Sequence, residues 1–305
     1  DILVIGSLNT DLVATIDRFP GPGETIIGKD FKTTCGGKGA NQAFAAGAFG
    51  GNVAMIGRVG KDDFGTAQLK SLSSQGVHTD YILRDHNHST GTALIGVEAS
   101  GENRIIIIPG ANNSLTPQSL QSHAAAIESA KLFLLQLEIP HDTVAEAIRL
   151  GNKFGATLIL DPAPAAPLPN EWLNSIDYLT PNLSELGLLS GHLIESETPL
   201  ETITTCARKL CDRGSRCVIV KLASRGALQV TVDEVTHYPA ASVKAIDTTA
   251  AGDSFCGALA DALVGGASIV EAAEWAVCVG AATTQRQGAQ PSLPTRDEVE
   301  SLLRP

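Results

Sequence analysis

Short apolar runs and longer amphipathic patterns alternate along most of this chain. Six runs are brief and rich in branched or aromatic residues, as is typical of strands buried on both faces; they cover 2–6, 52–60, 131–138, 157–161, 177–182 and 217–222. Between several of these runs, apolar residues recur at helical spacing over 39–50, 116–129 and 141–155. This alternation predicts an α/β fold, with a doubly wound, mostly parallel sheet flanked by helices.

Two segments interrupt the alternation. Residues 10–35 and 90–108 are strand-like, and neither contains a helical pattern. Gly-Pro-Gly at 21–23 and Ser-Gly-Glu-Asn at 100–103 supply the turns. We therefore expect one α/β domain, residues 1–305, with a small antiparallel β lid formed by the two inserted segments. Because both segments flank the polar motifs described below, a lid over the site is favoured over two decorative hairpins.

The composition disfavours several kinds of partner. A formal net charge of -11 disfavours nucleic acid and anionic membranes as partners. No apolar run approaches the roughly 20 residues that span a bilayer, and the N-terminal DILVIGS is interpreted as a strand and not as a signal peptide. Six cysteines without a C-x-x-C pair favour reduced thiols and a cytoplasmic location. His86 and His88 lie in a polar stretch without a third ligand, which favours a solvated loop over a metal site.

The segment GSLNTD, residues 6–11, directly follows the first predicted strand. Ligands of open α/β sheets bind beyond the carboxyl ends of the strands. Asn9 and Asp11 are two positions apart, so in an extended chain they point the same way. An amide and a carboxylate aimed together suit vicinal hydroxyls, although a plain polar turn explains this pair alone equally well.

A glycine-dense segment, CGGKGANQA at residues 35–43, opens a predicted helix near Ala40. Glycines allow backbone to approach a ligand closely, and a helix start offers free N–H groups. Three glycines exceed what a capping turn requires, so a ligand site is favoured, with Lys38 and Asn41 as partners of a polyol. The chain has neither a G-x-x-x-x-G-K-[ST] loop nor a strand-turn-helix G-x-G-x-x-G, and the second absence disfavours a nicotinamide oxidoreductase.

Further candidate positions follow three other strand runs. Glu138 closes an apolar run, either as a rim charge or as a hook for a ligand. Asn182 and Glu185 share one face if a helix starts there. Asn182 is then a helix cap or lies near phosphate, and Glu185 holds a hydrated Mg²⁺. The segment KLASRGA, residues 221–227, joins two strands through small residues and leaves room for a nucleotide.

The segment DTTAAGD, residues 247–253, carries the strongest chemical signal. Ala250, Ala251 and Gly252 have almost no side chain, so N–H groups at a helix N-terminus can form an anion hole for a transferred phosphoryl group. Asp253 follows at once, where a carboxylate can take the proton of a substrate hydroxyl. Phosphoryl transfer needs both parts, whereas a helix cap needs only one. We therefore interpret Asp253 as the catalytic base.

These segments, with DPAPA at 161–165 and GAQPS at 288–292, occur in the order and spacing of the ribokinases. The chain resembles this group of phosphofructokinase-B-like carbohydrate kinases over essentially its whole length, and GGKGANQ and D-T-x-A-A-G-D are highly specific. The resemblance implies ATP-dependent phosphorylation of D-ribose at O5 to ribose 5-phosphate. The alternatives are a kinase of another small sugar, such as deoxyribose, or a non-catalytic sugar-binding protein on the same fold. The latter would be expected to lose Asp253 or the anion hole.

The resemblance also assigns residues by position. It implies a sugar held by Asn9, Asp11, Gly37, Lys38, Gly39, Asn41, Glu138 and Asp253. It implies ATP along Asn182, Lys221, Leu222, Ala223, Ser224, Arg225, Gly226 and Gly252, with Mg²⁺ near Glu185 through water. It implies a monovalent cation, usually K⁺, bound mainly by backbone oxygens at Asp247, Thr249, Thr283, Arg286, Gly288 and Ser292. The family's lid often pairs with that of a second subunit, so a homodimer through the lid is expected.

Two positions depart from the family pattern. Asp161 stands where the family usually has asparagine, which adds a negative charge near the phosphates. Lys221 stands where a small hydroxyl residue is common. We expect the ammonium of Lys221 to offset the charge of Asp161.

Overall fold

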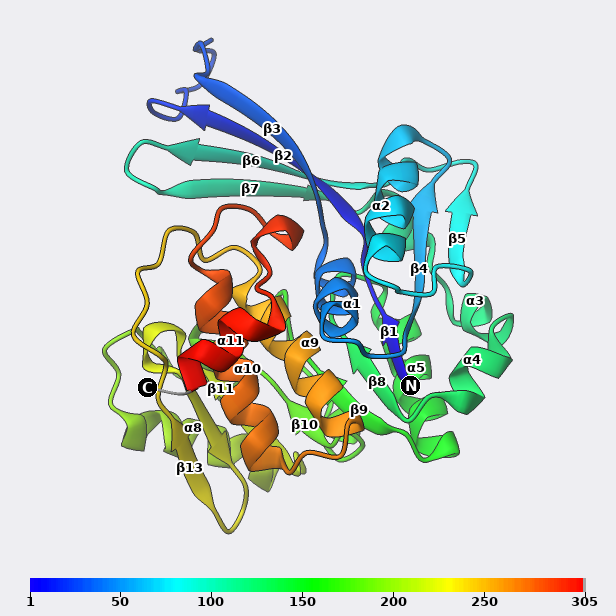
Figure 1. Ribbon diagram of the computed structural model, residues 1–305, viewed down its shortest axis with the longest axis vertical. Helices are drawn as coiled ribbons and strands as arrows, with labels where there is room; N and C mark the ends of the chain where they lie inside the picture. The colour runs from blue at the N-terminus through cyan, green and yellow to red at the C-terminus, as the bar shows by residue number, and fades with distance from the viewer. Residues whose placement is uncertain (304–305) are drawn as a thin grey trace.

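The computed structural model describes residues 1–303, and its larger sheet has nine strands (Figure 1). Their order is β13 (Val235–Tyr238), β12 (Ala227–Val230), β11 (Cys217–Lys221), β10 (Tyr178–Leu179), β9 (Thr157–Leu160), β8 (Leu132–Leu135), β1 (Ile2–Ile5), β4 (Val53–Gly60) and β5 (Ile82–Asp85). The strands from β11 to β5 run parallel, and β12 and β13 continue the sheet antiparallel. The predicted doubly wound, mostly parallel sheet is confirmed.

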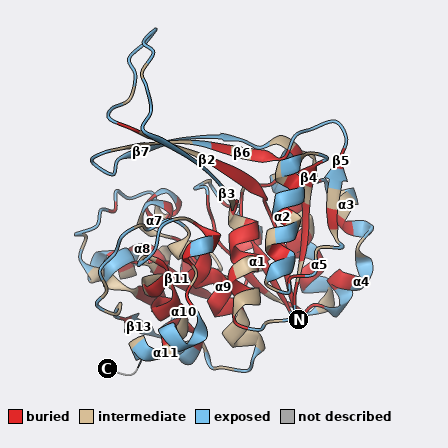
Figure 2. Ribbon diagram, turned by 45° about the horizontal axis from the view of Figure 1, so that its top comes forward, coloured by how far each residue is buried: buried red, intermediate tan, exposed pale blue. Residues whose placement is uncertain are grey.

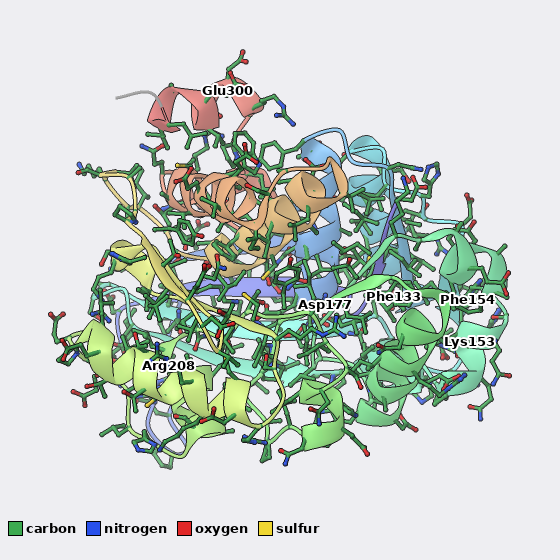
Figure 3. The ribbon with its side chains drawn as sticks, turned by 90° about the horizontal axis from the view of Figure 1, so that it is seen from below. Phe133, Lys153, Phe154, Asp177, Arg208 and Glu300 are labelled. Atoms are coloured by element: carbon green, nitrogen blue, oxygen red, sulfur yellow. The ribbon has the colours of Figure 1, made fainter. Side chains whose placement is uncertain are left out.

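Helices cover both faces of this sheet, as Figure 3 shows from below. One face packs against α1 (Lys38–Ala48), α2 (Asp63–Ser74), α9 (Ala251–Val264), α10 (Ile269–Thr283) and α11 (Arg296–Leu303). The other packs against α3 (Pro117–Gln121), α4 (Ala124–Ser129), α5 (His141–Phe154), α6 (Asn170–Leu173), α7 (Leu183–Ser190) and α8 (Leu200–Asp212). Three short 3₁₀ turns complete the chain: η1 (Gly110–Ser114), η2 (Ala223–Arg225) and η3 (Gln290–Ser292).

Strand β1 shows why apolar and polar residues do not alternate in the apolar runs that form strands. Ile2 and Val4 pack on the side of α1 and α9, and Leu3 and Ile5 pack on the opposite side. Phe133 of β8, labelled in Figure 3, is fully buried in the same cluster as Leu3. Successive side chains of a strand point to opposite faces, so a strand covered on both faces is apolar at every position.

The two inserted segments, the predicted lid, form a four-stranded sheet in the order β3 (Asp30–Gly36), β2 (Asn9–Ile16), β6 (Gly91–Glu98) and β7 (Asn103–Ile108). The two outer pairs are antiparallel, and the central pair of β2 with β6 is parallel. Only residues 6–8 separate β1 from β2, so the four-stranded sheet directly continues an inner strand of the larger sheet, between β8 and β4. Figure 2 shows the lid reaching away from the body, with β7 exposed along its length.

Three elements differ from their expected bounds. The helical pattern 116–129 divides into α3 and α4, because Ser122 and His123 end one helix and begin the next. The run 131–138 leaves the strand after Leu135, so Glu138 lies in the loop beyond the sheet. Strand β10 has only two residues, since Pro181 has no N–H to extend the ladder.

Helices α1 and α9 pack closely against each other, and Gly257 permits this contact. A Cβ atom at Gly257 would lie 2.6 Å from Ala45 Cβ and 2.6 Å from the Gln42 carbonyl oxygen. Any side chain at this position would therefore push the two helices apart. Their close contact brings the start of α1 to the first turn of α9.

None of the helices within residues 1–303 is both long and apolar enough to cross a membrane. All six cysteines lie within this range and are free, and five of them are buried. Burial raises the pKa of the Cys217 and Cys256 thiols to about 12, so both stay protonated.

Candidate active site

Asp253 lies in the first turn of α9, and two amides from α1 hold its carboxylate. Asn41 Nδ2 donates to Asp253 Oδ2 at 2.9 Å, and Gln42 Nε2 donates to Asp253 Oδ1 at 3.2 Å. The Asp253 side chain is buried at 7% exposure, yet it lines a cavity of about 1010 Å³. The carboxylate is therefore fixed in direction and accessible to a ligand, as a general base must be.

The backbone before Asp253 supports the predicted anion hole with one change. Ala250 caps α9 in the left-handed region, with φ of 59°, a costly conformation for a residue with a side chain. The Ala251 N–H turns back to the Thr248 carbonyl at 3.2 Å. The N–H groups of Ala250, Gly252 and Asp253 donate to no group within residues 1–303. An anion hole at this place would therefore have the Asp253 N–H available in place of the Ala251 N–H, because the tight turn takes the latter.

Glu138, which is half-buried, is the centre of a second network. Its Oε2 accepts from Ser7 Oγ at 2.5 Å, from Asn9 Nδ2 at 3.3 Å and from the Lys38 N–H at 3.2 Å. Asn112 fixes the Asn9 amide by donating to Asn9 Oδ1 at 2.7 Å. Burial raises the pKa of Glu138, and the charge of Asp253 adds to this, against the opposing effects of Lys38 and Ser7. Glu138 thus ties the start of β2 to the start of α1.

The side-chain oxygens of two residues in this region accept no hydrogen bond from the described protein. Asn41 Oδ1 is buried and accepts no hydrogen bond, and the Asp11 carboxylate accepts none from residues 1–303. Burial, with the charges of Glu138 and Asp253, raises the pKa of Asp11 to about 7. Asn9 and Asp11 lie two positions apart in β2 and so share a face of the lid. These acceptors suit the hydroxyl donors of a polyol.

The glycines of the GGKG segment fit tightly against the turn after β1. Gly37 has a φ of 90°, and a Cβ atom there would lie 2.5 Å from the Asn9 nitrogen. A Cβ atom at Gly39 would lie 2.6 Å from the Ser7 nitrogen. These glycines are therefore required for protein packing, and the sequence-based interpretation as room for a ligand had missed this need.

A cavity of about 1010 Å³ extends from Asp253 along the ends of β9, β10 and β11. Its lining combines charged side chains with backbone and small apolar residues: Lys38, Asp161, Glu185, Lys221, Asp253, Ala223, Ser224, Gly226, Ala240, Val243, Val277 and Ala281. The Leu222 and Arg225 side chains do not line it. Leu222 is 1% exposed in the core, and Arg225 Nη1 donates to the Thr198 carbonyl. In the 221–226 loop, nucleotide contacts of these two residues would therefore come from their backbone and not from their side chains.

Asn182 and Glu185 form a reciprocal helix cap at the start of α7. Asn182 Oδ1 accepts from the Glu185 N–H at 2.8 Å, and Glu185 Oε2 accepts from the Asn182 N–H at 2.7 Å. This is the capping interpretation, which the sequence left open beside the functional one. Both residues also line the large cavity, so the cap fixes them there. Burial raises the pKa of Glu185, and Lys221 opposes this shift.

The two departures from the family pattern contact each other, as expected. Lys221 Nζ donates to Asp161 Oδ1 at 2.7 Å, and Asp161 is 1% exposed. Burial alone would lower the pKa of Lys221, but Asp161 and then Cys256 and Glu185 raise it above its ordinary value. Burial alone would likewise lower the pKa of Lys38, but the carboxylates of Asp253, Asp161 and Glu138 raise it above its ordinary value. Both ammonium groups stay charged beside the cavity.

The predicted cation segments lie side by side behind α9. The Ile246 and Asp247 N–H groups both donate to the Thr284 carbonyl, at 2.7 and 3.1 Å. Asp247 Oδ2 accepts from the Gly288 N–H at 2.9 Å, and Asp247 Oδ1 accepts from Thr249 Oγ1 at 2.7 Å. The other polar side chains of the set are also occupied: Thr283 bonds to Ser254, Ser292 to the Ala289 carbonyl, and Arg286 to Glu298. Backbone oxygens of these segments are therefore the main candidates to hold a cation, and carbonyl ligands would suit K⁺.

Sequence reasoning missed three residues that orient the site: Ser7, Gln42 and Asn112. Ser7 and Gln42 lie inside the quoted motifs, beside Asn9 and Asn41, so their positions were available from the sequence. Asn112 lies about a hundred residues from its partners, and its role depends on tertiary contact alone. Within residues 1–303, no cluster of three or more His, Cys, Asp or Glu side chains could hold a metal ion.

A smaller cavity of about 390 Å³ lies between the lid and the loop after β8. Its lining includes Asn9, Asn112, Glu138, His141 and Ile107 of β7. It is thus closed partly by the lid and adjoins the Glu138 network. The small space has amide and carboxylate groups in its lining, and the large one holds the fixed carboxylate of Asp253 in the first turn of α9. Two adjoining spaces of this kind suit phosphoryl transfer to a hydroxyl.

The family model described as pfkB family carbohydrate kinase matches residues 1–296. The chain belongs to this family and is a sugar kinase.

Individual relatives agree with this assignment. The chain is 40% identical to the ribokinase of Bacillus subtilis (strain 168), over 99% of both chains. It is 37% identical to the deoxyribokinase of Salmonella typhi, over 99% of this chain and 98% of the relative. Among solved structures, Arabidopsis thaliana ribokinase complexed with ribose and ATP matches with a TM-score of 0.92 and 36% identity, over 99% of this chain and 98% of that one.

Proposed function

We propose that this enzyme transfers the γ-phosphoryl group of ATP to O5 of D-ribose, giving ribose 5-phosphate and ADP. The observation that carries the proposal is the Asp253 carboxylate. Asn41 and Gln42 hold this carboxylate by hydrogen bonds. It lies in the same helix turn as the free N–H groups that start α9. The relatives named ribokinase support the choice of sugar.

In the proposed step, the ribose O5 hydroxyl gives its proton to Asp253 as O5 attacks the γ-phosphorus. The bond from phosphorus to the bridging oxygen of ATP breaks, and its electron pair leaves with ADP. Negative charge on the phosphoryl oxygens is stabilised by the N–H groups of Ala250, Gly252 and Asp253. The helix N-terminus adds a favourable dipole at the same place.

We place the sugar against the Glu138 network, where its hydroxyls reach acceptors without protein partners. Asp11 and Asn41 Oδ1 accept from these hydroxyls, and Asn9 is already oriented by Asn112. Glu138 has a second oxygen, Oε1, that accepts no hydrogen bond from residues 1–303. A site with several fixed acceptors favours a fully hydroxylated pentose.

We place ATP in the large cavity. The ammonium groups of Lys38 and Lys221 suit phosphates, and the apolar side chains of Val243, Val277 and Ala281 suit a base. When bound, Mg²⁺ would neutralise phosphate charge, and Glu185 is suited to hold its hydration water. K⁺ would be held by backbone oxygens of the 247–249 and 283–292 segments. Exhaustive exchange into a buffer free of K⁺ and Na⁺ should lower the rate, and an unchanged rate would contradict the K⁺ site.

A homodimer through the lid is the proposed assembly, in the cytoplasm. Strand β7 exposes a continuous apolar row, with Ile105 at 52% and Ile106 at 64% exposure. Phe31 on β3 is exposed to 62%, so apolar residues line both edges of the lid. Exposed apolar patches of this kind mark interaction sites. Sedimentation equilibrium should give a dimer that Ile106→Lys dissociates, and a monomeric parent protein would refute this assembly.

A second candidate substrate is 2-deoxyribose, because a deoxyribokinase is among the full-length relatives. The deciding experiment measures kcat/KM for ribose, 2-deoxyribose and a panel of other pentoses and hexoses, with ATP and Mg²⁺. We expect ribose to be preferred, because a missing hydroxyl leaves polar groups of the site unpaired at about 1–3 kcal/mol each. Equal values, or a preference for the deoxy sugar, would overturn the ribose assignment.

A further inference from the structure

Lys221 ends β11, and its ammonium lies against the first turn of α9. A Cβ atom added to Gly252 would be 3.4 Å from Lys221 Nζ, with no closer neighbour. The Lys221 side chain is only 13% exposed, and both residues line the large cavity. The ammonium therefore lies against Gly252, the residue whose N–H group is free at the start of α9.

The partners of Lys221 leave part of its donor capacity unused. Nζ donates to Asp161 Oδ1 at 2.7 Å and lies 3.9 Å from Cys256 Sγ, a weak and distant acceptor. An ammonium has three N–H donors. At least one of them has no acceptor within residues 1–303, in a side chain that borders the cavity. That donor is available to a ligand.

Asp161 also connects Lys221 to the catalytic base. Its second oxygen, Oδ2, accepts from Gln42 Nε2 at 3.0 Å, and the same nitrogen donates to Asp253 Oδ1 at 3.2 Å. The Gln42 amide is held in this orientation because its Oε1 accepts from Gln136 Nε2 at 2.6 Å. One glutamine amide thus fixes the distance between the carboxylate that holds the lysine and the carboxylate that takes the proton.

We propose that Lys221 binds the phosphoryl group in transfer, adding a full positive charge to the N–H groups of α9, with Asp161 and Gln42 as positioning residues. The proposal rests on the kinase activity described above. A lysine that served only as counter-ion to Asp161 would need the Asp161 contact and nothing more. The location of Nζ against Gly252 serves no such purpose. It serves a phosphoryl group whose oxygens gain negative charge and which the N–H groups hold.

The test removes the charge of Asp161 first, so that the lysine can be studied without its partner. Asp161→Asn is compared with the double variant Asp161→Asn/Lys221→Met, in which both side chains are neutral and close in size to the originals. Asp161→Asn/Lys153→Met is the matched control, because Lys153 lies on the exposed surface of α5 (Figure 3). Calorimetry measures the affinity for AMP, ADP and a non-hydrolysable ATP analogue, and steady-state kinetics give KM and kcat.

Loss of Lys221 should weaken the affinity for the ATP analogue about 10- to 100-fold relative to that of Asp161→Asn, as expected for a hydrogen bond from a charged donor. It should lower kcat, leave AMP affinity and the KM for ribose unchanged, and have no counterpart in the Lys153 control. Equal analogue affinity with and without Lys221 would identify a mere counter-ion and overturn the proposal. An equal loss for AMP would overturn it too, because the contact would then lie at the nucleoside. Should Lys221→Met lower the thermal midpoint, Lys221→Gln replaces it.

The binding measurements need no sugar. If the parent protein bound ATP but phosphorylated no sugar, the proposed function would fail, and the affinities would still decide whether Lys221 contacts the terminal phosphates.

Discussion

The two halves of the active site are built differently. On the sugar side, charged and amide side chains from separate elements meet: Asp11 from β2, Asn41 from α1, Glu138 from the loop after β8 and Asp253 from α9. Asp11, Asn41 and Asp253 are buried and Glu138 is half-buried; Asn41 donates to Asp253, and Asn9 donates to Glu138. On the nucleotide side, the lining consists mostly of small residues and backbone, around one buried ion pair of Asp161 with Lys221.

This difference follows from the ligands that the two halves are proposed to hold. A small polyol offers only hydroxyls, so its recognition requires several donors and acceptors in fixed directions. A nucleotide offers phosphates, which backbone N–H groups bind well, and a flat base, which needs mainly space and apolar surface. Single side-chain changes should therefore have specific effects on the sugar side. On the nucleotide side, changes that add volume should matter more.

The largest expected effect is at the point where the two halves meet. Asp253→Asn should keep the fold and much of the sugar affinity but lose about 10²–10⁴ in kcat, because an amide cannot take the proton from O5. Steady-state kcat, calorimetric ribose affinity and the thermal midpoint measure the three properties separately. Asp142→Asn is the control, since Asp142 also lies in the first turn of a helix but on the surface. A variant that turns over within a few-fold of the parent would make Asp253 a structural cap.

The next largest effect is expected from Glu138→Gln, which should impair ribose binding and leave ATP binding unchanged. Glutamine keeps one acceptor oxygen but adds an NH₂ group, which cannot accept from Ser7, Asn9 or a sugar hydroxyl. The KM for ribose should rise about 10- to 100-fold, in line with the loss of a charged hydrogen bond, and the KM for ATP should stay unchanged. Glu128→Gln, on the exposed face of α4, should change neither. A parallel rise of both KM values would show that Glu138 supports the whole site and not the sugar half.

Candidate residues of the sugar half stand out in the sequence more clearly than those of the nucleotide half, for a physical reason. Buried polar side chains such as Asp11, Asn41 and Asp253 are unusual among apolar neighbours, so they stand out in a sequence. Their spacing after strands and at helix starts then places them at one edge of the sheet. Glu138 alone was a weak signal, because its role depends on Ser7 and Asn9, more than a hundred residues away.

The nucleotide half has few such signals. Alanines and glycines that line the cavity look the same in a sequence as those packed in a core. Leu222 and Arg225 fall between residues that do line the cavity, and only the turn η2 decides which side chains face it. The hydrogen bond from the Ala251 N–H to the Thr248 carbonyl likewise depends on the geometry of one turn. The doubly wound sheet was predictable because periodicity is repeated over many residues, whereas a loop orientation depends on one or two dihedral angles.

Gly252→Val should affect the nucleotide half alone, more weakly than the changes above. A Cβ atom at this position fits, at 3.4 Å from Lys221 Nζ, but the two further methyl groups of valine enter the space beside the anion hole. We expect a rise of about tenfold in the KM for ATP, comparable to losing one hydrogen bond, with ribose affinity retained. Gly252→Ala should lie between valine and the parent. If ribose affinity fell as much as ATP affinity, the two halves would not be separable at α9.

The smallest expected effect is a pH dependence that belongs to the sugar half of the free protein. The pKa of Asp11 is raised from 3.8 to about 7, mainly by burial and then by Glu138 and Asp253. Between these two pH values the folded protein binds more protons at Asp11 than the unfolded chain does, so the free energy of unfolding falls as pH rises through this window. Asp11→Asn removes this contribution.

The thermal midpoint of Asp11→Asn should therefore exceed that of the parent by more at pH 8 than at pH 5. At pH 5 the parent carries a neutral Asp11 that resembles asparagine, whereas at pH 8 it holds a buried charge near two other carboxylates. Asp142→Asn should show no such trend, because its carboxylate is exposed. Saturating ribose should reduce the difference at pH 8, because sugar hydroxyls then donate to the ionised Asp11. A difference that stays constant from pH 5 to pH 8 would mean that Asp11 is ionised throughout, and that the sugar half tolerates its three carboxylates without a ligand.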